Sequence, residues 1–249
     1  MCTTYCGNVA AQSKENVNMA VIYLIRHGQA SFGKDDYDCL SEQGTLQATH
    51  LGNSLAKRQI TFDKVIIGGM LRHRQTADNC LQAMQHSGTA AVADDAWNEY
   101  DHQNILAQLD PQFASPQGLR HYVSKQDNPH LALDKIIGKA FTRWIGSEND
   151  QDYAESWTAY QDRIHSALTR LIKKSDDVKS IAVFSSGGPI ALLSQQILGV
   201  PAKNLMKLNW TLVNCGVTKL LSSRRGLTLS SLNEHTAFEG EFQNLISYK

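Results

Sequence analysis

A cation, an imidazole and a glycine stand together near the start of the chain, as Arg26, His27 and Gly28. They follow the apolar run 21–25, whose Val, Ile and Tyr residues predict a buried strand. We expect the glycine to let the backbone turn sharply just beyond that strand. Open α/β sheets place their ligands at the carboxyl ends of strands. A fixed guanidinium and a neutral imidazole there could bind a phosphoryl group and accept it.

A second group of cations follows another predicted strand, at residues 64–68. Arg72 comes just after a Gly-Gly turn, on the first turn of a helix predicted from about 70 to 85. A guanidinium binds phosphate oxygens through two parallel hydrogen bonds, which a lysine cannot reproduce. We therefore place Arg72 in the phosphate site. We expect Arg74 to be an ordinary solvated helix residue.

Two acids, Glu99 and Asp101, follow a third predicted strand at 90–93. A carboxyl group beside a bound phosphate could protonate the leaving alkoxide. Nearby negative charge and partial burial would raise its pKa toward the value that this role requires. Position alone does not choose between the two acids.

The elements that must position these residues alternate between strand and helix, which predicts an α/β fold. Ser41 is expected to cap a helix that buries apolar residues at 48, 51 and 55. The less periodic segment 101–150 contains three prolines and reads as an insertion over the sheet. The remaining predictions are a helix over 153–174, a strand over 179–185, a helix from 187 to about 198 that stops at Gly199, and closing strands over 209–221 and 226–232.

Three aromatic residues in and after the insertion allow two interpretations. Phe141, Trp144 and Trp157 could line a pocket for an apolar leaving group. Aromatic residues at such spacing more often belong to the core, which is the interpretation we favour.

Composition excludes several classes of protein. The chain has 249 residues, 42% hydrophobic and 19% charged, with a formal net charge of zero, so nothing draws it as a whole to nucleic acid or to an anionic membrane. No stretch reaches the roughly 18 apolar residues of a membrane span. The five scattered cysteines lack metal-site spacing and favour reduced thiols in a cytoplasmic protein. We expect a disordered leader at 1–18 and a single domain over 19–249.

These pieces together resemble the histidine phosphatase superfamily, also called the phosphoglycerate mutase-like family. The resemblance extends from about residue 19 to residue 233, and the Arg-His-Gly-Gln-Ala-Ser variant is similar to a bacterial subgroup. It implies a three-layer α/β/α sandwich around a mostly parallel mixed sheet. The matching pieces are Leu24–Gln29, Leu40 and Ser41 with Gly44, Gln47 and Ala48, Arg72 with Gln75, Thr76 and Ala77, then Glu99, Ser185–Gly188 and Asn214–Thr218.

The resemblance implies a role for each matching residue. His27 would be the nucleophile that becomes phosphohistidine, Arg26 and Arg72 would hold the phosphoryl oxygens, and Glu99 would be the general acid and later the base. No metal or other cofactor is implied, because the arginines supply the positive charge. The partner would be a small phosphorylated substrate or inorganic phosphate. The residues expected to line the substrate site are Gly28, Gln29, Ser31, Ser186 and Gly187.

One residue departs from the family pattern. Most members carry a second histidine where this chain has Ser186. A serine hydroxyl can donate one hydrogen bond but carries no charge, and loss of one preorganised donor typically lowers the rate about a hundredfold to a thousandfold. The amide of Gly187, at a helix N-terminus, would compensate in part. His102 is another histidine that could enter the pocket, although no spacing argument supports it.

Three functions are therefore compatible with the sequence. The one we favour is a metal-independent phosphatase that hydrolyses a small phosphomonoester through phosphohistidine. The second is a catalytically weak or inactive phosphate-ligand-binding protein of the same fold, for which Ser186 is the support. The third is a phosphoglycerate-type mutase, which fits least, because such mutases usually keep both histidines.

Overall fold

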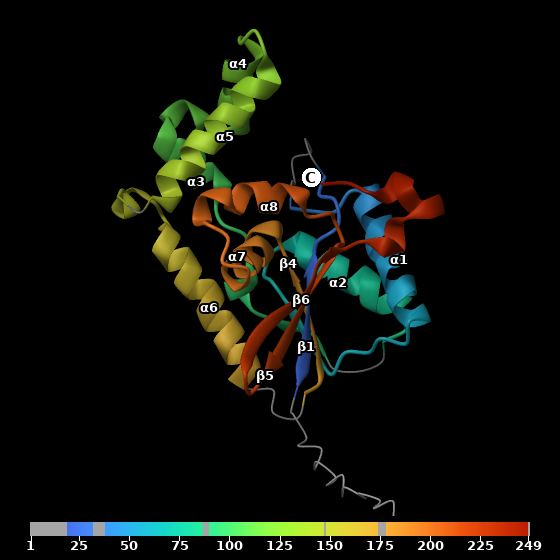
Figure 1. The fold of residues 1–249 in the computed structure, drawn as a ribbon. Helices are drawn as coiled ribbons and strands as arrows, with labels where there is room; N and C mark the ends of the chain where they lie inside the picture. The colour runs from blue at the N-terminus through green and yellow to red at the C-terminus, as the bar shows by residue number, and fades with distance from the viewer. Residues whose placement is uncertain (1–18, 32–37, 87–89, 147, 174–177, 249) are drawn as a thin grey trace, which may run out of the picture.

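A computed structural model describes residues 19–31, 38–86, 90–146, 148–173 and 178–248. The leader expected at 1–18 lies outside the described residues. In the part of the chain that is described, six strands form one mixed sheet in the order β3-β2-β4-β1-β5-β6 (Figure 1). The strands are β1 (Ala20–Arg26), β2 (Lys64–Ile67), β3 (Val92–Ala93), β4 (Ser180–Ser185), β5 (Val217–Ser223) and β6 (Gly226–Glu234).

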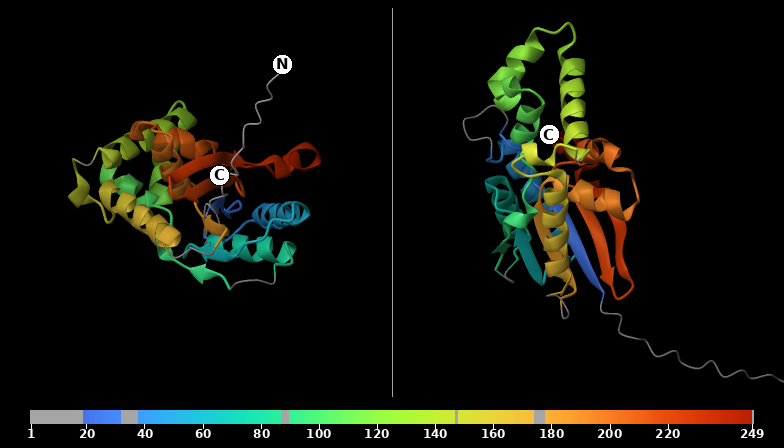
Figure 2. Two further views of the ribbon diagram at one scale, coloured as in Figure 1. Left: turned by 60° about the horizontal axis from the view of Figure 1, so that its bottom comes forward. Right: turned by 90° about the vertical axis from the view of Figure 1, so that its left-hand side faces the viewer.

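The central strand β1 lies between a parallel neighbour, β4, and an antiparallel neighbour, β5. Strands β2 and β3 continue the parallel part, and β6 extends the antiparallel part. Alternate residues of β1 therefore face opposite layers: Leu24 joins the core on one side and Ile25 the core on the other. Helices lie on both faces of the sheet (Figure 2), and the expected three-layer sandwich is confirmed.

Helices α1 (Glu42–Lys57) and α2 (Leu71–Ala83) cover one face, and α6 (Trp157–Lys173) and α7 (Gly187–Ile197) cover the other. Ser41 caps α1 as predicted, because its hydroxyl accepts a hydrogen bond from the amide of Gly44 at 3.0 Å. The short helix α8 (Leu205–Thr211) follows α7. Short 3-10 helices lie at Asp95–Trp97, Pro111–Ala114, Asp150–Asp152, Ala202–Asn204, Thr236–Phe238 and Gly240–Leu245.

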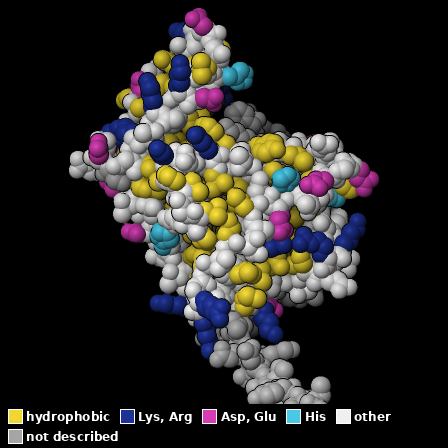
Figure 3. Space-filling view, in the orientation of Figure 1, with side chains coloured by type: hydrophobic (Ala, Val, Ile, Leu, Met, Phe, Trp, Pro, Cys, Tyr) yellow, Lys and Arg dark blue, Asp and Glu magenta, His cyan; other side chains and the backbone are white. Residues whose placement is uncertain are grey.

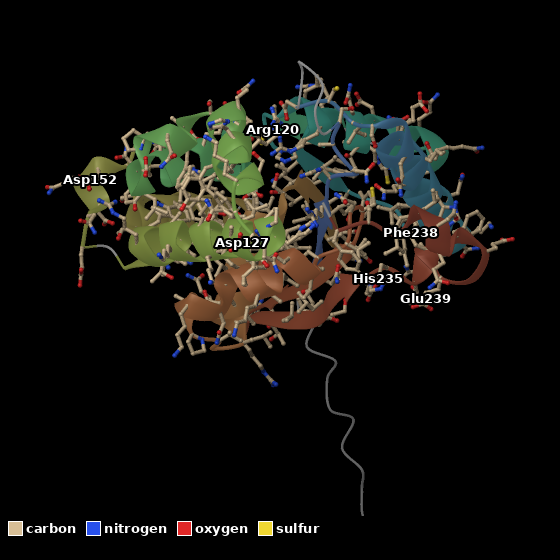
Figure 4. All side chains as sticks on the ribbon, turned by 90° about the horizontal axis from the view of Figure 1, so that it is seen from above. Arg120, Asp127, Asp152, His235, Phe238 and Glu239 are labelled. Carbon is tan, nitrogen blue, oxygen red and sulfur yellow. The ribbon has the colours of Figure 1, made fainter. Side chains whose placement is uncertain are left out.

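The segment predicted as an insertion carries α3 (His102–Leu109), α4 (Pro116–Ser124) and α5 (Pro129–Ile145), which project beyond the carboxyl edge of the sheet (Figure 1). Viewed from above (Figure 4), the helical region near Arg120 and Asp127 lies to one side and the turn with Phe238 to the other. On the face seen in Figure 3, hydrophobic side chains gather in the middle below the projection. No helix in the described part of the chain is long and apolar enough to cross a membrane.

Five aromatic side chains form what we call the aromatic cluster: Tyr100, Phe141, Trp144, Trp157 and Tyr160. All are buried and belong to the core on the α6 and α7 side of the sheet. Neighbouring rings meet at centroid distances of 5.1–5.9 Å, several of them edge to face. The prediction that the aromatic residues of this region are core rather than pocket lining is confirmed.

The strand predicted over 209–221 is wrong in its first half. Residues up to Thr211 belong to helix α8, and β5 begins only at Val217. The apolar residues before Asn214 look strand-like, but Cys215 has a φ of +57°, which no strand accommodates. By contrast, the predicted stop of α7 is confirmed, since Gly199 just beyond it has a φ of +65°.

Candidate active site

Three parallel strands bring the candidate residues to one edge of the sheet. Arg26 at the end of β1 is paired with Ser185 at the end of β4, and Ile67 at the end of β2 is paired with Phe184. The residues that follow each strand therefore emerge side by side. His27, Ser186 and the start of α2 meet there. We call this region the anion site and use the name for Arg26, His27, Arg72, Glu99 and Ser186.

His27 is buried, with 8% of its surface exposed. Its Nδ1 lies 2.7 Å from the carbonyl oxygen of Gly28. Because a carbonyl can only accept, Nδ1 carries the hydrogen and Nε2 keeps a lone pair. Burial holds the pKa of His27 well below its ordinary 6.5, and the positive charges of Arg72 and Arg26 lower it further. The imidazole is therefore neutral and able to act as a nucleophile.

Two guanidinium groups act on this imidazole. Arg26 donates through Nη1 to the carbonyl oxygens of Leu212 and, at 2.8 Å, Tyr248. Arg72 is 7% exposed, and its Nη1 lies 2.6 Å from a carboxylate oxygen of Asp38. Its Nε is buried and has no hydrogen-bond partner among the described residues. Both arginines thus bring positive charge to an enclosed site, which favours an anionic ligand.

Glu99, rather than Asp101, faces the anion site. Its carboxylate accepts hydrogen bonds from the amides of Gly188 at 3.1 Å and Tyr100 at 3.3 Å. Burial raises its pKa above the ordinary 4.5, although these amides, Arg72 and Arg26 oppose the shift. Asp101 is exposed and caps α3, where it accepts from two amides at 3.0 Å. Of the two acids between which the sequence could not choose, the structure therefore favours Glu99.

Gly28 is required by close approach and not by an unusual turn. Its backbone does not adopt the positive φ that glycine alone tolerates well. A Cβ at this position would lie 2.5 Å from the carbonyl oxygen of Gly44. The amide of Gly28 donates to Thr76 Oγ1 at 3.0 Å. Close packing against Gly44 is therefore the structural reason for a glycine at this position.

The other predicted lining residues separate into two groups. Gln29 and Ser31 use their side chains within the loop before α1: Gln29 Oε1 accepts from Ser41 Oγ at 2.8 Å, and Ser31 Oγ donates to the Leu40 carbonyl at 2.9 Å. Gly187 lies at the anion site, where a Cβ would come within 3.6 Å of Arg26 Nε.

Sequence reasoning missed the histidine that lies against Ser186. It is His73, whose Nε2 is 2.7 Å from Ser186 Oγ. His102, the other histidine that the sequence suggested, is the first residue of α3, where burial and the charge of Arg72 lower its pKa. The position of His73 directly after Arg72 was the signal that the sequence offered. Arg74, on the same turn of α2, is exposed as predicted.

The C-terminal segment was also missed, and it braces the anion site from behind. Asn214 donates to the His27 carbonyl oxygen at 3.0 Å and accepts from Ser247 Oγ at 2.9 Å. Gln47 donates to Leu245 O at 2.6 Å and to Ser247 Oγ at 2.8 Å. No sequence pattern indicates that residues so distant in the chain meet here.

A neutral histidine flanked by arginines and a carboxyl group, at the carboxyl edge of an α/β sheet, is typical of proteins that handle phosphoryl groups. The chain belongs to the histidine phosphatase superfamily (branch 1), whose family model matches residues 22–130 and 120–235. Within the described ranges, no group of three or more His, Cys, Asp or Glu side chains could hold a metal ion.

Two curated relatives match part of the chain. A 2,3-bisphosphoglycerate-dependent phosphoglycerate mutase of Mesorhizobium japonicum is 31% identical over 91 residues, which is 34% of this chain and 44% of that protein. The mitochondrial serine/threonine-protein phosphatase Pgam5 of Drosophila virilis is 40% identical over 67 residues, 26% of this chain and 23% of that protein. The match thus spans less than half of either relative.

Solved structures share the fold over most of their length. A phosphoglycerate mutase from Bacillus anthracis aligns with a TM-score of 0.63 and 19% identity, over 89% of this chain and 96% of that one. A phosphoserine phosphatase mutant from Entamoeba histolytica, in complex with phosphoserine, aligns with a TM-score of 0.60 and 16% identity, over 88% and 98%. At these identities the likeness shows the fold alone.

Proposed function

We propose that the protein is a metal-independent phosphatase that hydrolyses a small phosphomonoester through a phosphohistidine at His27. The observation that carries this proposal is the contact of that ring: His27 Nδ1 lies 2.7 Å from the Gly28 carbonyl oxygen, which can only accept. Burial and the charges of Arg72 and Arg26 lower the pKa of His27, which favours a neutral ring with its hydrogen on Nδ1 and a lone pair on Nε2. A nucleophile and its charge stabilisers are thus assembled before the substrate arrives.

The reaction then has two steps. In the first, His27 Nε2 attacks phosphorus, the bond to the leaving alkoxide breaks, and protonated Glu99 gives its proton to that alkoxide. In the second, the Glu99 carboxylate takes a proton from water, the water oxygen attacks phosphorus, and the bond from Nε2 to phosphorus breaks. Arg26 and Arg72 stabilise the charge on the phosphoryl oxygens in both steps. The raised pKa of Glu99 suits a group that must hold a proton and then accept one.

A phosphate-ligand-binding protein with little turnover is the second candidate. Ser186 favours it, because an uncharged hydroxyl stands at the edge of the anion site where a cationic donor would speed the reaction.

We also propose a cytoplasmic location, supported by the buried free thiols of Cys80 and Cys215.

The test compares wild type with His27→Ala on p-nitrophenyl phosphate, phosphoserine and 3-phosphoglycerate, with EDTA present. We expect slow, chelator-insensitive release of phosphate that falls at least about a thousandfold in the variant. His165→Ala, a change of an exposed histidine on α6, is the matched control and should keep the wild-type rate.

Equal rates in wild type and His27→Ala would reject the phosphatase. Binding of inorganic phosphate without turnover would support the second candidate. Transfer of phosphate within 3-phosphoglycerate without release would identify a mutase instead.

A further inference from the structure

Ser186 occupies a helix-capping position without capping the helix. It is the residue before α7, it is fully buried, and its side chain makes no hydrogen bond to the amides of the first turn. A serine at this position normally accepts from one of those amides. Here the amide of Gly188 donates to Glu99 instead, at 3.1 Å. The Ser186 hydroxyl is therefore committed to a different partner.

That partner is His73, on the first turn of α2. Its Nε2 lies 2.7 Å from Ser186 Oγ, and the residue has no exposed surface. The centre of its ring is 5.8 Å from the centre of the His27 ring. The backbone of Gly68 is packed so closely against it that a Cβ there would lie 2.2 Å from Nδ1. The end of strand β2 and the first turn of helix α2 thus fix the imidazole against the serine and near the nucleophile.

We propose that His73 and Ser186 act as a pair, in which the Ser186 hydroxyl donates to a phosphoryl oxygen and His73 positions that hydroxyl. The inference rests on the proposed function, because it names the donor for the phosphoryl group held by the same site. It assigns one task, usually given to a single histidine at position 186, to two residues on different elements. His73 is a positioning residue, since it acts through the serine.

The chemistry of a hydroxyl makes the pair directional. Ser186 has one hydrogen, so it can donate to a phosphoryl oxygen only while Oγ itself accepts from His73 Nε2–H. Burial and the Arg72 charge lower the pKa of His73 to about 3, against an opposing effect of the Gly68 backbone, so the ring is neutral and carries one hydrogen. The pair requires that hydrogen on Nε2, which faces Ser186 Oγ, and not on Nδ1, which has no side-chain or backbone hydrogen-bond partner at bonding distance among the described residues. A side chain with a donor at the same reach should replace His73, and an apolar one should not.

The experiment is a double-mutant cycle with two readouts: kcat and KM for p-nitrophenyl phosphate, and the Kd for inorganic phosphate by calorimetry. We expect His73→Leu and Ser186→Ala each to lower kcat and phosphate affinity about tenfold to a hundredfold. The double variant should be no worse than either single variant, because both remove the same donor. His73→Gln, whose amide can donate to Oγ, should retain most of both. His165→Leu is the matched control for an exposed histidine.

Additive losses, or equal losses for His73→Gln and His73→Leu, overturn the pair. Turnover that depends on His27 but not on His73 overturns it while leaving the phosphatase intact. If wild type shows no turnover but binds phosphate, and both variants weaken that binding, the pair is supported and the phosphatase is rejected. If wild type does not bind phosphate at all, the pair is overturned. Should His73→Leu fail to fold, nitrogen-15 NMR of wild type decides: a His73 ring without an Nε2 hydrogen in the phosphate complex overturns the proposal.

Discussion

The anion site and the aromatic cluster are both buried, but different forces hold them in place. In the anion site each guanidinium is directed by oxygen atoms: Arg26 by the Leu212 and Tyr248 carbonyls, and Arg72 by Asp38. Charges taken out of water need such partners, because burial without them is costly. In the aromatic cluster the rings are fixed mainly by shape and burial, and hydrogen bonds are made at their polar edges, by Trp144 Nε1 and by the Tyr100 hydroxyl. The comparison teaches that directional polar contacts set the orientation of the side chains in the anion site, whereas close packing holds the neighbouring rings in position.

The two regions meet at consecutive residues. Glu99 turns toward the anion site, and Tyr100 turns into the aromatic cluster, where its ring lies 5.1 Å from that of Phe141. Gly188 makes the junction possible, since a Cβ there would lie 2.0 Å from Glu99 Oε1 and 2.7 Å from the Tyr160 hydroxyl. The position of the acid therefore depends on packing outside the charged site.

The largest effect that would test this division is expected for Glu99→Gln. It keeps the shape of the side chain but removes the proton, so phosphoenzyme formation in single turnover should fall about a hundredfold to ten-thousandfold. The proposed mechanism needs protonated Glu99 in this step, so the wild-type rate should fall as pH rises through the raised pKa of that carboxyl. The variant should lose this dependence. Asp101→Asn is the control. A similar loss of rate in that variant would contradict the assignment of Glu99 as the acid.

Trp144→Ala should separate stability from chemistry. The indole is fully buried among four other rings, and its Nε1 donates to the Glu155 carbonyl at 2.9 Å. Truncation should lower the free energy of unfolding by about 3–5 kcal/mol, measured by urea denaturation. Leu131→Ala, on the exposed side of the same helix, should change it little. If the Trp144→Ala protein folds with an unchanged free energy of unfolding, the aromatic cluster does not have the stabilising role described here.

The smallest effect is expected for Arg163→Met, which sharpens the link between the two regions. Arg163 donates to the carbonyls of Ala96 at 3.0 Å and Asn98 at 2.9 Å, just before Glu99, and pairs with both carboxylate oxygens of Glu155. Its loss should loosen the loop that carries the acid and lower kcat about tenfold, with little change in KM. Arg170→Met, half exposed on the same helix, is the control. A change confined to KM would contradict the positioning role.

Much of the fold was predictable because its local signals agree. The β1 and β4 strands are apolar runs, the Ser41 cap is confirmed, and Gly199 ends α7. The prediction failed between Asn209 and Gly216, where tertiary contact overrides an apolar, strand-like sequence. There Asn209 lies on α8 and donates to the Tyr100 hydroxyl at 2.9 Å. Local propensity carries no information about such a contact.

The candidate site was predictable where its residues follow strands, because strand ends of a parallel sheet converge. That argument reached His27 and Arg72, and the structure separates the half-buried Glu99, bonded to the Gly188 amide, from the exposed Asp101, which caps α3. The argument from strand ends could not reach His73, because its contact with Ser186 depends on how α2 packs over the strand ends. Contacts between residues 113 positions apart follow from packing, not from spacing.

The brace formed by residues 245–248 has a practical consequence for anyone who purifies this protein. The Tyr248 carbonyl accepts from Arg26 at 2.8 Å, and Leu245 and Ser247 accept from Gln47. A truncation that removes these residues would take an oxygen partner from the Arg26 guanidinium. Kinetic constants should therefore be measured on protein that retains them.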